Sequence, residues 1–455
     1  METSSPLTKK SLNLLQGDII STLTRLALPI MASALIQMAY NLVDTAWIGR
    51  LGYRSVAAVG AAGMFIWFGD GLLLLSRIGG QVYLGQNLGR GDFAAAQKTV
   101  RAALQLTACI SLTYTILQFV FTPRLVAFFH FTEASTIQQA ETYLRLVGLG
   151  YFFSFTTRVY TSLVTVDGRS KISMYATIIG LLLNFVLDPL CIFTFGWGAA
   201  GAAIATVFSQ AVVFICFLWA TRNEKLFRKL RILTCPDFRE WRKILRLGLP
   251  PALQTMLYSS IAMVLARMIT EFGDAAISIQ KVGSQIESLS WMTAEGFGVA
   301  LTAFIAQNFG AGQWKRTKQG FNKACLIMTC LGFVTTSILI GLPQYIFQIF
   351  ITDPQVIPGG ISYLRILGLS QFFMCLEIIT AAAFAGVGQT ALCSFIVVIL
   401  TGARIPLAYY LIHTSLGVNG VWWAISLSSI AKGIILTVLF KIYETKLICS
   451  RQSEI

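Results

Sequence analysis

The sequence predicts an all-α polytopic membrane protein, with twelve transmembrane helices in two six-helix lobes related by a parallel internal repeat. Three observations support this fold class. Apolar residues make up 55% and charged residues 12% of the 455 residues, a balance that soluble globular chains do not show. Twelve stretches reach the roughly 20 predominantly apolar residues that a helix needs to cross a bilayer. Several motifs of the first half also recur in the second half.

The twelve predicted spans follow one another with short connections. Their approximate centres are Leu35, Leu73, Ile110, Phe152, Leu183, Ser209, Ser259, Trp291, Gly332, Phe373, Leu400 and Leu427. Lys and Arg gather in both tails and in the loops from each even span to the next odd one. The positive-inside rule therefore predicts cytoplasmic termini. The positive charges that give the net charge of +15 thus indicate membrane topology. We expect the lipid bilayer to be the partner of the chain, and we expect no nucleic-acid partner.

The most basic connection, Arg222 to Arg246, lies near the midpoint of the chain. We therefore predict a first lobe at residues 1–221, a cytoplasmic linker at 222–244 that lies against anionic lipid, and a second lobe at 245–455.

Motifs of the first lobe return in the second with a shift of 221 residues. Leu28-Pro29 recurs as Leu249-Pro250, and Gln86–Gly91 recurs as Gln307–Gly312. Because each lobe holds an even number of spans, the two repeats enter the membrane with the same orientation, related by an axis along its normal. Two such lobes around a central cavity are typical of a transporter.

Four oxygen-bearing side chains on three spans of the first lobe are expected at a similar depth. Asp44 lies about 28 Å, and Asp188 about 24 Å, from the cytoplasmic ends of their spans. Asn184 lies one turn before Asp188, and Thr206 lies about 12 Å inward from the start of span six. This donor set suits a hard cation such as sodium. Two carboxylates buried in apolar surroundings suit a proton as well. The sequence therefore allows either sodium or a proton as the coupling ion.

Gln37, Tyr40 and Asn41 form one polar stripe with Asp44 at helical spacing, and we expect them to support this site. The repeat supplies an internal control, because Asp44 maps onto Leu265 and Asp188 onto about Ala408. If the acids served only to pack helices together, the second lobe would be expected to need them too.

Further charges within the spans allow two interpretations. Glu287, Glu295 and Glu377 could attract a cationic substrate into a cavity, or could pair with basic residues. The basic residues considered are Arg267, Lys281, Arg365 and Arg404. The flexible side chains of methionines could line the same cavity and adapt to different substrates. They could instead pack against other helices or face lipid. The candidates for a substrate cavity are Glu287, Glu295, Glu377, Met31, Met256 and Met292. Asp70 and Arg77, seven residues apart on span two, are expected to neutralise each other.

Four motifs in this order, Leu28-Pro29, Tyr40–Asp44, Asn184–Pro189 and Gly198–Thr206, resemble those of the multidrug and toxic compound extrusion (MATE) transporters. The run Asn-x-x-x-Asp-Pro is similar to that of the DinF-like branch. The resemblance covers about Gly17 to Tyr443.

The resemblance implies cation-coupled antiport, with export of organic cations and other amphipathic multidrug compounds in exchange for Na⁺ or H⁺. It also implies that Asp44, Asn184, Asp188 and Thr206 belong to the cation-binding site. Gln37 and Tyr40 would then belong to the accompanying hydrogen-bond network. Glu295 departs from the pattern of many members.

Other functions remain as alternatives. A flippase for lipid-linked precursors or polysaccharides would share the repeat but would need a more cationic cavity, and a sensor could bind a ligand without moving it. The sequence has no nucleotide loop, metal triad or nucleophile constellation, so we expect no enzyme and no cofactor besides the coupling ion. We expect a monomer in the cytoplasmic membrane of a prokaryote.

Overall fold

The computed structural model describes residues 12–51, 53–129, 133–228, 234–350, 354 and 356–452. Within these ranges the regular secondary structure is helical throughout, with no strand. Eleven of the described helical segments are long and apolar enough to cross a membrane. The helix α4 (Ala134–Val166) has 33 residues and is long enough to be the twelfth, but it carries Glu141, Arg145 and Arg158. The predicted fold class is confirmed.

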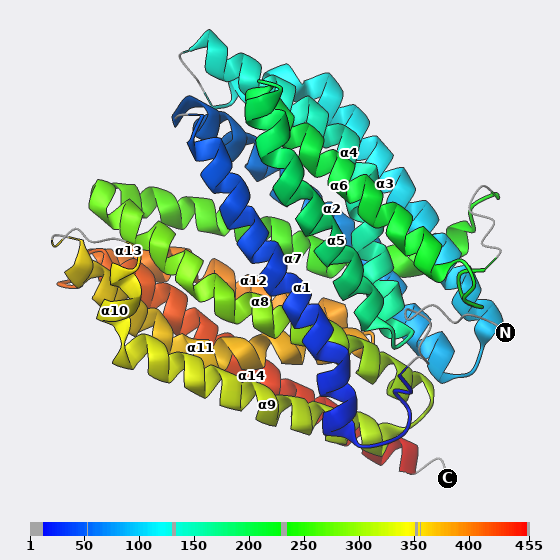
Figure 1. The fold of residues 1–455 in the computed structure, drawn as a ribbon. Helices are drawn as coiled ribbons and strands as arrows, with labels where there is room; N and C mark the ends of the chain where they lie inside the picture. Colours follow the sequence, from blue (N-terminus) through cyan, green and yellow to red (C-terminus); the bar gives the residue numbers. More distant parts are fainter. Residues whose placement is uncertain are drawn as a thin grey trace. The chain divides into compact units, whose positions relative to one another are not determined.

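The chain separates into two compact units, whose helices are drawn in Figure 1. We call the unit that contains Leu28–Ala252 and the described residues before Leu15 the N-lobe. Its helices are α1 (Ile19–Gly49), α2 (Tyr53–Gly89), α3 (Phe93–Ala127), α4, α5 (Ser170–Pro189), the π-helix η1 (Leu190–Thr194) and α6 (Gly198–Thr221).

We call the second unit, Leu15–Ala27 with the residues from Leu253 onward, the C-lobe. Its helices are α7 (Phe238–Thr270), α8 (Asp274–Gly310), α9 (Trp314–Gly341), α10 (Pro343–Gln348), α11 (Ile357–Gly386), α12 (Thr390–Gly402), α13 (Arg404–Ile412) and α14 (Asn419–Gln452).

The boundaries between the two units fall inside helices α1 and α7. The first boundary directly precedes Leu28-Pro29, and the second follows Ala252, one residue after Pro250-Pro251. The predicted lobe limits at 221 and 245 follow the connection between spans instead. The units and the predicted lobes differ because the units are defined by contacts between residues, whereas the predicted lobes follow the order of the spans in the sequence.

Helix boundaries repeat with the offset found in the sequence. The limits of α2, 53 and 89, correspond to those of α8, 274 and 310, and the first residues of α3 and α6 correspond to those of α9 and α14, all with an offset of 221. The helix boundaries therefore agree with the internal repeat.

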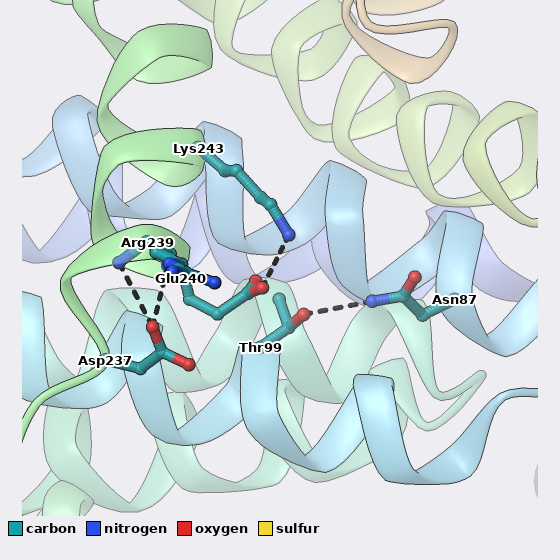
Figure 2. A network of polar contacts seen from close by, with 6 residues as sticks. All are labelled: Asn87, Thr99, Asp237, Arg239, Glu240 and Lys243. Carbon is teal, nitrogen blue, oxygen red and sulfur yellow. Dashed lines mark hydrogen bonds and ion pairs between the residues drawn. The ribbon is translucent and has the colours of Figure 1, made fainter.

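The repeated Gln-Asn-x-Gly-x-Gly motif forms the turn between the second and third helices of each repeat. In the N-lobe, Asn87 Nδ2 donates to Thr99 Oγ1 across 3.0 Å, as Figure 2 shows. Gly91 and Gly312 have φ angles of +76° and +71°, a left-handed conformation that favours glycine. The motif therefore has a structural role in both repeats.

Helix α7 begins within the predicted linker. The Asp237 carboxylate accepts hydrogen bonds from the backbone N–H groups of Arg239 and Glu240, and Lys243 Nζ lies 2.6 Å from Glu240 Oε1 (Figure 2). A side-chain oxygen that caps the first turn satisfies N–H groups that otherwise lack a partner. The linker thus ends in a capped helix that belongs to the N-lobe up to Ala252.

Candidate functional site

The polar pair of α5 lies at the point where the helix changes its winding. Asn184 and Asp188 are one turn apart and retain 2% and 0% exposure. Pro189 ends α5, and because it has no N–H it cannot donate to the carbonyl one turn back. The chain continues as the π-helix η1, a wider winding that often marks functional sites.

Two glycines allow α6 to pack closely against this region. A Cβ atom on Gly180 would lie 2.3 Å from Val213 Cγ2, and one on Gly201 would lie 2.6 Å from the carbonyl oxygen of Cys191. Such distances are shorter than any tolerated contact, so both positions require a missing side chain. The close approach brings Thr206 of α6 toward the polar face of α5.

Helix α1 completes the group. The hydroxyl oxygens of Tyr40 and Thr206 are 3.1 Å apart, and the ring of Trp47 packs edge-on against Phe193 of η1 with centroids 6.0 Å apart. Asp44, between these two anchors, lies within electrostatic range of Asp188. The structure therefore brings together Asp44, Asn184, Asp188 and Thr206, the four predicted residues.

Several polar atoms of this group have no partner among the described residues. They are Asp44 Oδ1, both carboxylate oxygens of Asp188 and both amide atoms of Asn184, all buried. Asn184 lies against Asp188, yet no hydrogen bond of good geometry joins the two. Buried polar groups in proteins almost always have a partner. A cation would satisfy these carboxylate and amide oxygens together, so the donor set fits a hard cation or a proton.

Sequence reasoning missed Tyr143 of α4. This buried tyrosine lies within electrostatic range of both Asp44 and Asp188. Its recurrence as Tyr363 in the second repeat was a signal, but depth along its own span could not show which helices it faces. Gln37 and Asn41 hydrogen-bond each other along α1, with Gln37 Nε2 donating to Asn41 Oδ1 across 3.3 Å.

The acidic candidates of the C-lobe have partners of their own. Glu377 accepts from Lys432 Nζ at 2.7 Å, with the two side chains only 13% and 4% exposed. Glu287 accepts from Gln371 Nε2 at 3.3 Å. Lys432 was not among the partners considered from the sequence, although a lysine inside an apolar stretch was a visible signal. Glu295 is exposed on α8.

The methionine candidates belong to different units. Met31 lies in the N-lobe, whereas Met256 and Met292 lie in the C-lobe, and all three are half-buried. Their grouping into one substrate cavity therefore stays a prediction.

The C-lobe carries an arginine where the N-lobe carries Asn184. Counted from the first residues of α12 and α5, Arg404 is the equivalent of Asn184. Its Nε donates to Ser428 Oγ at 3.1 Å, one NH2 group donates to Ser429 Oγ at 3.0 Å, and its guanidinium lies over the Tyr258 ring.

The equivalents of the two N-lobe acids, Leu265 and Ala408, are buried in a hydrophobic cluster of the C-lobe. The two repeats thus differ in charge at corresponding places.

Comparisons with known proteins agree with this architecture. Residues 29–190 and 250–410 match the MatE family, and the two matched segments begin 221 residues apart. The chain is 28% identical to "Probable multidrug resistance protein NorM" of Thermotoga maritima over 89% of this chain and 88% of that one. It is 26% identical to "Probable multidrug resistance protein YpnP" of Bacillus subtilis, covering 78% and 80%.

Among solved structures, the fold resembles that of the "Outward-facing conformation of a multidrug resistance MATE family transporter of the MOP superfamily". The TM-score is 0.90 at 25% identity, and the likeness covers 97% of this chain and 99% of that one. Together, the helical repeat, the family match over both halves and the shared fold show that this chain is a multi-pass membrane transporter, not an enzyme, and that it belongs to the MatE family.

Proposed function

We propose that this protein is a cation-coupled antiporter that exports organic cations and other amphipathic compounds by alternating access. The names of its relatives support multidrug efflux. The observation that carries the coupling is the set of buried oxygens without hydrogen-bond partners on Asp44, Asn184 and Asp188. Removing these groups from water is unfavourable unless they gain a partner, and a cation from the membrane exterior supplies one.

Coupling requires that the cation and the exported compound stabilise different arrangements of the transporter. A ligand shifts a conformational equilibrium only by as much as its affinities for the two states differ. Cation binding at Asp44 and Asp188 from outside favours one state, and substrate binding from inside favours the other. Na⁺ and H⁺ both suit the donor set, so the gradient must be tested with each ion separately.

Reconstituted proteoliposomes test the proposal directly. Export of a fluorescent lipophilic cation is measured under an imposed Na⁺ gradient and, separately, under an imposed H⁺ gradient. The variants Asp44→Asn and Asp188→Asn should lose gradient-driven export by at least about tenfold, the effect of a lost charge-assisted contact. Asp92→Asn is the matched control, because Asp92 only caps α3 and asparagine caps equally well. Wild-type export by both site variants would overturn the assignment.

A flippase of the same superfamily is the alternative. It needs cationic groups without a counter-ion for a pyrophosphate. The buried guanidinium of Arg404 is engaged by Ser428 and Ser429, and that of Arg158 is neutralised by Asp70. Proteoliposomes that scramble a lipid-linked pyrophosphate, but fail to move the lipophilic cation under either gradient, would favour the flippase.

A further inference from the structure

A second charged group of the N-lobe takes no part in the candidate cation site. Arg158 NH1 of α4 lies 2.6 Å from Asp70 Oδ1 of α2, and the two side chains are 45% and 31% exposed. The sequence suggested Arg77 as the neutralising residue for Asp70; the structure shows an ion pair of Asp70 with Arg158, which joins two helices. Arg158 was missed because a partner 88 residues away cannot be found from spacing along one span.

The depth of this ion pair makes contact with lipid costly. Asp70 lies near the middle of α2, whose candidate span is Ala58–Gly89. Charged side chains at membrane depth almost always face a bundle interior or an aqueous cavity, since contact with hydrocarbon is costly. Side chains that are a third to a half exposed at this depth are therefore expected to face water, where a solute can reach them.

The ion pair leaves N–H groups of Arg158 available for a ligand. The contact with Asp70 employs one of the five N–H groups of the guanidinium, and the described residues provide Arg158 with no second hydrogen-bond acceptor. The planar guanidinium can bind a carboxylate through two parallel hydrogen bonds. The carboxylate of Asp70 can likewise accept from an ammonium group of a ligand.

Aromatic residues of α2 and α3 lie near Asp70, and Tyr114 of α3 is within electrostatic range of its carboxylate. Trp67 precedes Asp70 by one helical turn and is 71% exposed. On the neighbouring residue, the Phe68 ring lies 6.4 Å from that of Tyr114. The Tyr114 ring can approach α2 closely because residue 69 is a glycine: a Cβ there would lie 2.8 Å from the ring. Flat aromatic surfaces favour flat ligands and attract cations.

The second repeat shows that the ion pair is unnecessary for packing these helices. The equivalents of Asp70 and Arg158 are Trp291 on α8 and Ile378 on α11. The corresponding helices α8 and α11 pack together without this ion pair. A charged pair that packing does not require, and that solvent reaches, indicates a role in binding.

We propose that Asp70 and Arg158 form a substrate subsite for aromatic zwitterions. The ligand's carboxylate binds the free N–H groups of Arg158, its cationic group lies near Asp70, and its rings contact Trp67, one turn before Asp70. The role of this subsite in export rests on the proposed function. Binding itself does not, so the two can fail separately.

Two fluorescent dyes of nearly the same shape test this subsite. Tetramethylrhodamine carries a carboxylate and a delocalised cation, whereas its methyl ester carries only the cation. Fluorescence anisotropy of each dye with the purified full-length protein gives the dissociation constants. Arg158→Gln should weaken tetramethylrhodamine binding by at least about tenfold, as expected for a lost charge-assisted hydrogen bond, while binding of the ester is kept. Asp70→Asn should weaken both dyes.

A control on the same helix separates this role from a structural one. Arg145 also forms a half-exposed ion pair, with Glu141 at 3.4 Å, and Arg145→Gln should leave the binding of both dyes unchanged. Equal losses of both dyes in Arg158→Gln, or no loss of tetramethylrhodamine, would overturn the subsite. If both dyes bind as expected but no ion gradient drives their export, the antiport proposal fails and the subsite stands.

Discussion

At the scale of single residues, the candidate cation site shows what spacing along a helix can and cannot predict. The depths of Asp44, Asp188 and Thr206 followed from counting residues along three spans, because the rise of a helix is fixed. The participation of Tyr143 did not follow, since it depends on how α4 rotates against its neighbours. Partner choice is a property of packing, and for the same reason Arg158 and Lys432 were missed.

The hydroxyl of Tyr143 should support the two acids. Tyr143→Phe keeps the buried ring and removes only the hydroxyl, so folding should be little changed. We expect the concentration of coupling ion for half-maximal export to rise severalfold, because the dipole of this hydroxyl lies within electrostatic range of both carboxylates. Export measured against ion concentration in proteoliposomes checks this. An unchanged ion dependence would show that Tyr143 only packs.

Asp167, in the turn between α4 and α5, should make stability depend on pH. Burial raises the pKa of this carboxyl to about 6, although the neighbouring Arg169 lowers it. Because the pKa in the folded state exceeds that of the unfolded chain, protonated Asp167 stabilises the fold, and this contribution is lost as the pH rises from about 4 through about 6.

Above pH 6, Asp167→Asn should therefore unfold at a higher temperature than the wild type. Its free energy of unfolding should exceed that of the wild type by at most about 3 kcal/mol. The difference should vanish below about pH 4. Thermal unfolding in detergent from pH 4 to pH 8 measures it, with Asp92→Asn as the control. Parallel profiles for the wild type and Asp167→Asn would contradict this account.

At the scale of helices, the long apolar elements and their repeat were predictable, because hydropathy and motif offset are local properties of the sequence. The π-helix η1 after Pro189 was not. Proline explains why the regular hydrogen bonding of α5 ends, but it does not decide between a kink and a wider turn. That outcome depends on contacts with α1 and α6, such as the Trp47–Phe193 ring pair.

The contact between α6 and η1 should be sensitive to any side chain at residue 201. Gly201→Val would place Cβ about 2.6 Å from the backbone oxygen of Cys191, which cannot move aside. We expect a lower unfolding temperature and weaker coupling-ion dependence, since Thr206 moves with α6. Gly60→Ala on α2, where a Cβ meets no atom within 4 Å, is the control. Equal behaviour of the two variants would show that α6 adapts freely.

At the scale of the whole molecule, the two lobes differ in how they place pairs of buried charges. The N-lobe brings two acids, Asp44 and Asp188, near each other with buried oxygens that lack hydrogen-bond partners, whereas the C-lobe neutralises Glu377 with Lys432 and leaves one buried oxygen of Glu287 without a partner. The sequence showed that the C-lobe lacks the acid pair. It could not show that a lysine from α14 satisfies Glu377, because the two residues lie 55 positions apart.

The Glu377–Lys432 pair gives a test of this difference. Glu377→Gln leaves Lys432 buried without its counter-ion and should lower the free energy of unfolding by about 3–5 kcal/mol. The double variant Glu377→Met, Lys432→Met removes both charges and should recover most of that loss. Thermal unfolding of the purified variants measures both effects. A double variant as unstable as Glu377→Gln would show that the pair contributes more than mutual neutralisation.

Arg404 has a consequence for how the two halves diverged after the duplication that the repeat records. At the place of Asn184, the second half holds a guanidinium bound by Ser428 and Ser429, which is a cation tethered to the chain. In the antiporter proposed above, only one half then exchanges ions with the medium, so that half alone sets the number of ions moved per transport cycle. In that antiporter, both copies of the scaffold are kept and the exchangeable ion belongs to one of them.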